Sequence, residues 1–160
     1  MKILFLPLPN KFYLNEDCRL IWGEILTCGR KLNGEVFLFS KYHSLTEVFI
    51  NNKLVIKENL LMQPLLIDPT AIGQLEGFTH QASFIFLDEK TNCVDAADTI
   101  HEYLSLQPEV IFGITAAPAN GLIIRLLGYK AEQLHDCLKA IVKTIESGTK
   151  IINPVVANAR

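Results

Sequence analysis

Glu24, Glu35 and His80 are the residues of this sequence whose types and positions best suit acid–base or metal chemistry. Glu24 lies in the apolar segment Leu20–Cys28, and the alternation of a β-strand puts its side chain on the same face as Trp22. An unpaired carboxylate is costly to bury. Glu24 therefore requires a cationic partner or a raised pKa, unless the segment is an edge strand from which Glu24 reaches solvent.

Glycines flank Glu35 and the end of the preceding segment. Gly29 and Gly34 have the composition of a turn, across which Arg30 and Glu35 can form an ion pair. The same turn can bring Glu24 and Glu35 near each other, which leaves a two-carboxylate hydrolase open as an alternative function. Aromatic residues typical of a sugar-binding cleft do not accompany this pair in the sequence.

Two other polar side chains, His80 and Arg125, interrupt or border apolar segments. The imidazole of His80 can bind a metal ion or titrate near neutral pH, and it can also be a hydrogen-bonded structural residue. Arg125 stands inside the apolar stretch that runs from Gly121 to Gly128. An arginine there pairs with a nearby acid, extends toward solvent, or binds an anion or a partner protein.

Familiar catalytic motifs are absent from the sequence. It contains no G-x-S-x-G elbow, no phosphate-binding P-loop and no G-x-G-x-x-G fingerprint. The cysteines have neither zinc-site nor dithiol spacing, so reduced, packed thiols are expected; they are Cys18, Cys28, Cys93 and Cys137. The pattern favours a protein that is not an enzyme.

The elements that must position these residues begin with a strand-rich first half. Segments rich in β-branched and aromatic residues alternate with turn residues, and Asn51-Asn52 suits a tight turn with positive φ. Apolar residues on both sides of the second segment predict a strand covered on both faces. The predicted strands are Leu20–Cys28, Glu35–Phe39, Leu45–Ile50 and Leu54–Lys57.

The second half is predicted to have the order β-α-β-β-α. This order is part of the ferredoxin-like arrangement, so a small-molecule-binding domain is a second alternative. Gly148 suits the C-terminal cap of the last helix, and the tail from Ile151 to Arg160 is expected to be extended. The predicted elements are strand Ala82–Asp88, helix Asp95–Leu106, strands Val110–Thr115 and Leu122–Leu127, and helix Lys130–Glu146.

Composition narrows the class of protein. The 160 residues suit a single domain, with a β-rich part (1–88), a helix-hairpin-helix part (89–150) and a tail (151–160). A content of 49% hydrophobic and 20% charged residues excludes a disordered chain, and a net charge of −2 argues against nucleic-acid binding. No apolar run is long enough to cross a bilayer, so a cytoplasmic location without membrane contact is expected.

The order and gaps of the motifs resemble those of the UreD/UreH-type urease accessory proteins. The string W-x-E-I-L-x-x-G-R is followed by G-E, then by G-x-x-H, and then by G-L with R-L-L-G, over about residues 12 to 147. The residues that carry the resemblance are Trp22, Glu24, Ile25, Leu26, Gly29, Arg30, Gly34, Glu35, Phe37, Gly77, His80, Gly121, Leu122, Arg125, Leu126, Leu127 and Gly128.

This resemblance implies a scaffold or chaperone rather than an enzyme. Members of the family help to insert nickel into urease, in a complex with other accessory proteins, among them a nickel-carrying GTPase, and with the urease apoprotein. Their β-helix-like stack of strands with two helices implies a mainly β, α+β fold. The family's internal polar tunnel implies transient nickel contacts at Glu24, Glu35 and His80, without a tightly bound cofactor. Family members also carry a long β-rich stretch ahead of the matched part.

Overall fold

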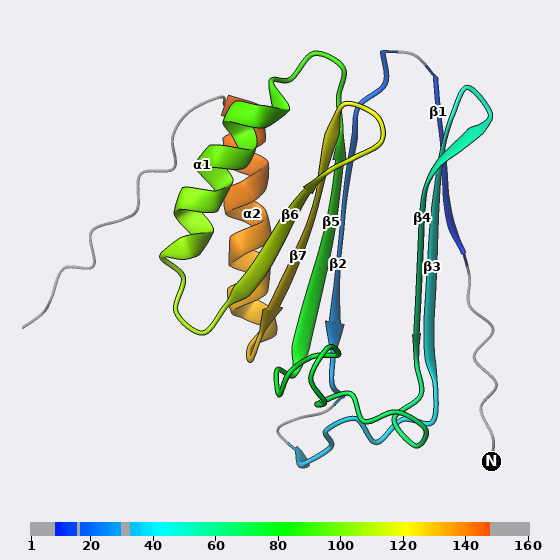
Figure 1. Cartoon of the computed structure of the whole chain (residues 1–160), viewed down its shortest axis with the longest axis vertical. Coiled ribbons are helices and arrows are strands. Elements are labelled where there is room, and N and C mark those ends of the chain that lie inside the picture. The colour runs from blue at the N-terminus through cyan, green and yellow to red at the C-terminus, as the bar shows by residue number, and fades with distance from the viewer. Residues whose placement is uncertain (1–8, 16, 30–32, 148–160) are drawn as a thin grey trace, which may run out of the picture.

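The computed structural model describes residues 9–15, 17–29 and 33–147, which fold into three layers. Two helices form one outer layer, a four-stranded sheet of order β2-β5-β7-β6 the middle, and a three-stranded sheet of order β1-β3-β4 the other outer layer (Figure 1). In chain order the elements are β1 (Asn10–Leu14), β2 (Leu20–Thr27), β3 (Tyr42–Ile50), β4 (Lys53–Met62), β5 (His80–Leu87), α1 (Cys93–Ser105), β6 (Ile111–Ala116), β7 (Gly121–Gly128) and α2 (Ala131–Ser147).

Two apolar clusters join the three layers. The first lies between the helices and the four-stranded sheet and includes Phe84, Phe86 and Ile141. The second lies between the two sheets and includes Val48 and Ile85. Side chains alternate along a strand, so neighbouring residues of β5 contribute to opposite clusters. Both faces of the middle sheet are therefore covered, which explains why its strands read as nearly continuous apolar runs.

The architecture confirms the prediction of a mainly β, α+β fold. The order β5-α1-β6-β7-α2 reproduces the predicted β-α-β-β-α half, and Asn51 and Asn52 have φ angles of 50° and 63° in the turn between β3 and β4. The β-helix-like stacking that the resemblance implies is not confirmed, because the strands form two separate sheets. The ferredoxin-like alternative fails on strand direction: β5 and β7 are antiparallel, whereas the two central strands of that fold are parallel.

The predicted strand Glu35–Phe39 is wrong. Phe37 has a φ of 54°, which a strand does not adopt, and its backbone N–H donates to the carbonyl oxygen of Cys28 at 2.7 Å, which ties this loop to the end of β2. Its ring is buried in a third cluster, with Cys28, Met62 and Leu75. The aromatic residues of this segment therefore fix a loop to the end of the sandwich instead of covering two faces of a strand.

The remaining differences concern one additional strand and the ends of predicted elements. Strand β1 was not predicted, and α1 begins at Cys93 because the side chain of Asn92 accepts hydrogen bonds from the backbone N–H groups of Val94 and Asp95. Arg30, Gly148 and the tail from Ile151 to Arg160 lie outside the described residues.

Candidate functional site

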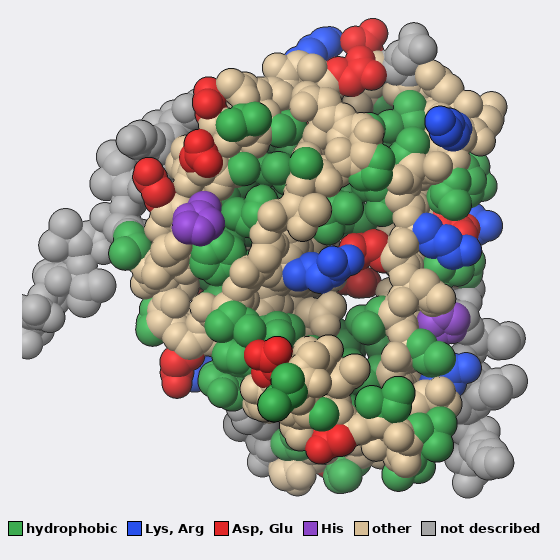
Figure 2. Space-filling model, viewed as in Figure 1, with side chains coloured by type: hydrophobic (Ala, Val, Ile, Leu, Met, Phe, Trp, Pro, Cys, Tyr) green, Lys and Arg blue, Asp and Glu red, His purple; other side chains and the backbone are tan. Residues whose placement is uncertain are grey.

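A polar cavity of about 190 Å³ lies between the two sheets. Figure 2 shows a hollow at the centre of this face, where basic and acidic side chains meet. Strands of both sheets contribute to its wall. The lining residues are Glu24, Ser44, Lys57, Glu58, Asn59, Leu60, Gln81, Ser83 and Arg125.

Three of the lining residues form one row across the middle sheet. Glu24 of β2 pairs with Ser83 of β5, and Ser83 pairs with Arg125 of β7. Residues paired across a sheet point to the same face, so all three side chains face the three-stranded sheet. The alternation predicted for Leu20–Cys28 therefore places Glu24 correctly, on the face that it shares with Trp22.

Glu24 is half-buried, and its hydrogen-bond donor in the described part of the chain is neutral. The hydroxyl of Ser44 donates to its two carboxylate oxygens, at 3.4 and 3.3 Å. Burial raises the pKa of Glu24 above its usual value, the Ser44 hydrogen bond offsets part of this effect, and the nearby negative charge of Glu58 adds to it. Two of the alternatives considered from the sequence are therefore combined: β2 is an edge strand of its sheet, from which Glu24 remains partly exposed, and burial of the rest of the side chain raises its pKa.

Arg125 combines two of the roles that the sequence left open. Its guanidinium donates to the carboxylate of Glu58, on β4 of the opposite sheet. The side chain of Glu58 is only 14% exposed, whereas that of Arg125 is 56% exposed. Arg125 thus pairs with a largely buried acid and extends toward solvent at the same time, and it joins the two sheets at the cavity.

Arg125→Leu is expected to lower the free energy of unfolding at pH 7 by about 1–2 kcal/mol. Removing the guanidinium leaves the carboxylate of Glu58 without its cation and close to the negative charge of Glu24. Because Arg125 is largely exposed, the loss in free energy of unfolding lies between that of breaking an exposed ion pair and that of breaking a buried one. Urea unfolding measures the change, with Arg125→Lys as the charge-retaining control. An Arg125→Leu variant as stable as Arg125→Lys at pH 7 contradicts this role.

The structure does not bring the three expected nickel-route residues together. His80 pairs with Thr27 of β2 and, by alternation along β5, shares a face with Ala82, which packs against the helices. Glu24 lies on the opposite face of the same sheet. The Nδ1 atom of His80 lies 2.9 Å from the hydroxyl oxygen of Thr79, which is the hydrogen-bonded setting of a structural histidine.

Glu35 lies beyond the end of β2, in the loop after Gly34. A side chain at Gly29 would come within 3.1 Å of the carbonyl oxygen of Glu35, so the two residues are neighbours. Glu35 is not among the residues that line the cavity at Glu24, so the structure gives no support to the hydrolase alternative, which needs two carboxyl groups about 5–9.5 Å apart in one site.

The other motif residues have structural roles where the structure describes them. Gly29, Gly34 and Gly77 have φ angles of 116°, 75° and 83°, which favour glycine. Trp22 packs on Phe12 of β1, with ring centroids 4.9 Å apart. Gly121 is required for another reason, because a Cβ atom there would lie 2.0 Å from the carbonyl oxygen of Phe86.

The cavity offers oxygen ligands but no closed metal site. Within residues 9–15, 17–29 and 33–147, no group of three or more His, Cys, Asp or Glu is placed to hold a metal ion. Because Glu58 is paired with Arg125, Glu24 and several neutral oxygens remain, and these can make only brief contact with a hydrated cation. The sequence analysis did not identify Glu58 and Ser44. Nothing in the pattern of β3 or β4 indicates which strand of the other sheet these two side chains face.

Comparison with known proteins decides the family. Residues 8–157 match the family described as UreD urease accessory protein. This chain belongs to the UreD family. Proteins named urease accessory protein UreD are 46% identical over 142 residues in Flavobacterium johnsoniae and 34% identical over 138 residues in Acetivibrio thermocellus. These alignments cover 85% and 82% of this chain, and 50% and 52% of the relatives.

The chain therefore spans about half the length of the curated relatives that it matches. A third relative, from Actinobacillus pleuropneumoniae, is 27% identical over 87% of this chain and 53% of its own length. The relatives are named as accessory proteins, not as catalysts. None of the helices in the described part of the chain has the length and apolar character needed to cross a membrane.

Proposed function

We propose that this chain acts in urease maturation as a non-catalytic scaffold or chaperone. It takes part in nickel incorporation within a complex that contains the other urease accessory proteins, including the nickel-carrying GTPase, and the urease apoprotein. The observation that carries the proposal is the family match over residues 8–157. The cavity between the sheets is compatible with it, because Glu24 and neutral oxygens face the cavity beside Lys57 and Arg125, and among the described residues no closed ligand set would retain a cation.

Within this proposal, Glu24 is the residue that contacts nickel in passing. Its carboxylate faces the cavity, and the donor that it meets among the described residues is the neutral hydroxyl of Ser44, which does not compensate its charge. A single carboxylate without other charged ligands holds a cation weakly, so such a contact is reversible. His80 and Glu35 lie away from this cavity, and a nickel contact there is a separate prediction.

Glu24→Gln is expected to stabilise the fold at pH 7. A raised folded-state pKa means that the folded protein binds this proton more tightly than the unfolded chain. Stability therefore falls as pH rises from the unfolded-state pKa of about 4.3 through the folded-state pKa. The neutral amide of the substituted glutamine avoids this loss in the free energy of unfolding. Thermal melts should show a higher melting temperature for Glu24→Gln than for the unaltered chain at pH 7, and no difference near pH 4.

The same variant tests the function. Urease activity in cells that co-express the urease operon should fall with Glu24→Gln, while the accessory complex still elutes intact from a sizing column. Glu47→Gln is the matched control, because Glu47 lies outside the cavity; a hydrogen bond from Lys11, helped by Lys57, lowers its pKa. That control should lose stability at pH 7 and still activate urease. Normal activation by Glu24→Gln would contradict the role assigned to this carboxylate.

A further inference from the structure

Several large aliphatic side chains are exposed on the loop that joins β4 to β5, residues 63–79. Leu65 is 85% exposed, Leu66 74%, Ile67 59% and Ile72 95%. Apolar side chains gather at the lower end of the molecule in Figure 2, where Figure 1 shows this loop. Single exposed hydrophobic residues are ordinary, but a group of them on one loop indicates a binding surface.

Internal hydrogen bonds hold the loop in one shape. The carboxylate of Asp68 accepts hydrogen bonds from the backbone N–H and the hydroxyl of Thr70, at 2.8 and 2.7 Å. The N–H of Leu75 donates to the carbonyl oxygen of Pro69 at 2.9 Å, and that of Gly77 donates to the carbonyl oxygen of Thr70 at 3.1 Å. The aliphatic side chains are thus presented by a backbone that is already ordered, which lowers the entropic cost of binding.

Two apolar anchors attach the loop to the fold. Leu75 is 4% exposed and packs in the cluster that contains Met62. The ring of Phe78 lies against that of Tyr129, with centroids 4.7 Å apart. Leu65, Leu66, Ile67 and Ile72 take no part in the three apolar clusters, so the described structure gives no packing reason for their being apolar.

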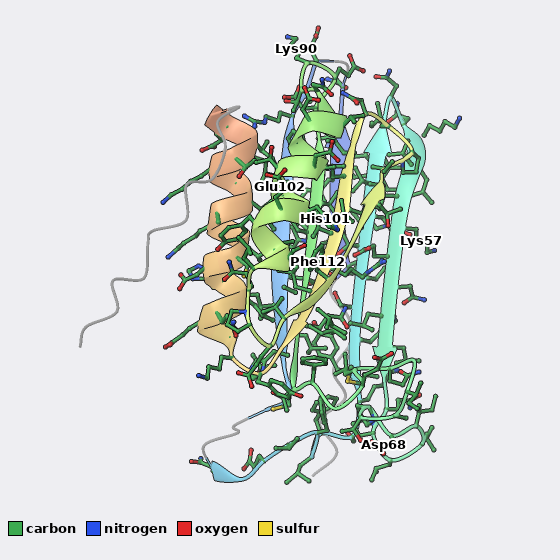
Figure 3. The ribbon with its side chains drawn as sticks, turned by 60° about the vertical axis from the view of Figure 1, so that its left-hand side comes forward. Lys57, Asp68, Lys90, His101, Glu102 and Phe112 are labelled. Carbon is green, nitrogen blue, oxygen red and sulfur yellow. The ribbon has the colours of Figure 1, made fainter. Side chains whose placement is uncertain are left out.

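Charge decides what kind of surface this loop can meet. Residues 63–79 contain Asp68 and Glu76 and no lysine or arginine. Figure 3 places Asp68 at the end of the molecule opposite Lys90. An anionic lipid surface repels such a segment, because peripheral membrane segments use basic residues beside their apolar ones. A protein groove with an apolar floor and a basic rim complements both the aliphatic side chains and the two acids.

We propose that loop 63–79 docks on a partner protein of the urease maturation complex. Leu65, Leu66, Ile67 and Ile72 enter an apolar groove of that partner, and Glu76 meets a basic side chain at its rim. This inference rests on the proposed function, since it takes the partner from the same complex. It assigns the loop to partner binding, a role separate from that of the cavity between the sheets.

The test is binding of the tagged chain to its co-expressed partners. The double variant Leu65→Ser, Ile72→Ser should bind the accessory proteins or the urease apoprotein on the order of 100-fold more weakly than the unaltered chain. The matched control is Val94→Ser with Leu106→Ser, because these residues are 70% and 65% exposed but lie on and beside α1. The control should bind like the unaltered chain, and all variants should melt at similar temperatures.

Each result separates this inference from the proposed function. Equal binding by the loop variant overturns the docking role and leaves the proposed function standing. Failure of the unaltered chain to bind any of these partners overturns both. If the loop variant keeps partner binding but no longer binds phosphatidylcholine–phosphatidylserine vesicles, the loop meets a membrane and the docking role is overturned. If it keeps partner binding but loses a dimer on a sizing column, the loop meets a second copy of the chain, which also overturns the docking role. Glu76→Lys should weaken partner binding at low salt and less so at high salt.

Discussion

Gly121→Ala is expected to destabilise the fold by about 3 kcal/mol or more. Gly121 begins β7 opposite Leu87 of β5. A Cβ atom at this position would lie 2.0 Å from the carbonyl oxygen of Phe86 and 2.8 Å from Cδ2 of Leu87. Backbone atoms cannot move aside as a flexible side chain can, so β5 and β7 must separate to admit the methyl group. Equilibrium unfolding in urea measures the loss.

Gly113 supplies the control for this substitution. It lies in β6, the strand next to β7, and an added Cβ atom there would have no neighbour within 4 Å. Alanine lowers the entropy of the unfolded chain, so Gly113→Ala should be neutral or stabilising by up to about 1 kcal/mol. Equal stabilities of the two variants would show that the close approach at Gly121 is not what requires glycine.

Phe84→Ala is expected to cost about 3–5 kcal/mol, the range for removing a large buried aromatic side chain. Phe84 is 1% exposed and belongs to the cluster between the helices and the middle sheet. Its ring also lies 3.5 Å from the position of a Cβ atom at Gly23, close to Leu138 of α2. The resulting cavity should loosen α2, which hydrogen exchange of its backbone amides detects together with the loss of stability.

Phe49→Ala is the matched control. Phe49 is half-buried and stacks on Tyr13, with ring centroids 4.8 Å apart, away from the helices. Losing this contact should cost about 1 kcal/mol and leave exchange in α2 unchanged. If Phe49→Ala destabilises as much as Phe84→Ala, the cluster under the helices is not the main source of stability.

Local patterns predicted the elements whose signals are complete within a short window. The apolar spacing of the last helix predicted Lys130–Glu146, and the structure has Ala131–Ser147. Asn51-Asn52 predicted the turn between β3 and β4. The segment Glu35–Phe39 was wrongly predicted as a strand. Aromatic residues that anchor a loop, such as Phe37, give a segment the same composition as aromatic residues that lie in a strand.

The candidate site could be predicted only in part. The alternation of side chains along Leu20–Cys28 predicted that Glu24 shares a face with Trp22, because both residues lie in the same strand. The pairing of Arg125 with Glu58 joins two sheets across 67 residues of sequence, and no local pattern encodes the order in which strands of different sheets meet. His80 lies on the other face because it alternates with Ser83, the residue of β5 that pairs with Glu24, and the sequence does not show which residue of β5 that is.

The pairing of β2 with β5 also sets the order in which the chain can fold. Leu20 pairs with Leu87 and Thr27 with His80, so β2 gains its neighbour only after the ribosome has made β5. The β3–β4 and β6–β7 hairpins form between adjacent segments and need no such delay. During synthesis the apolar strand Leu20–Thr27 therefore waits unpaired, and the competition between its folding and its aggregation in that interval governs how much native protein a cell recovers.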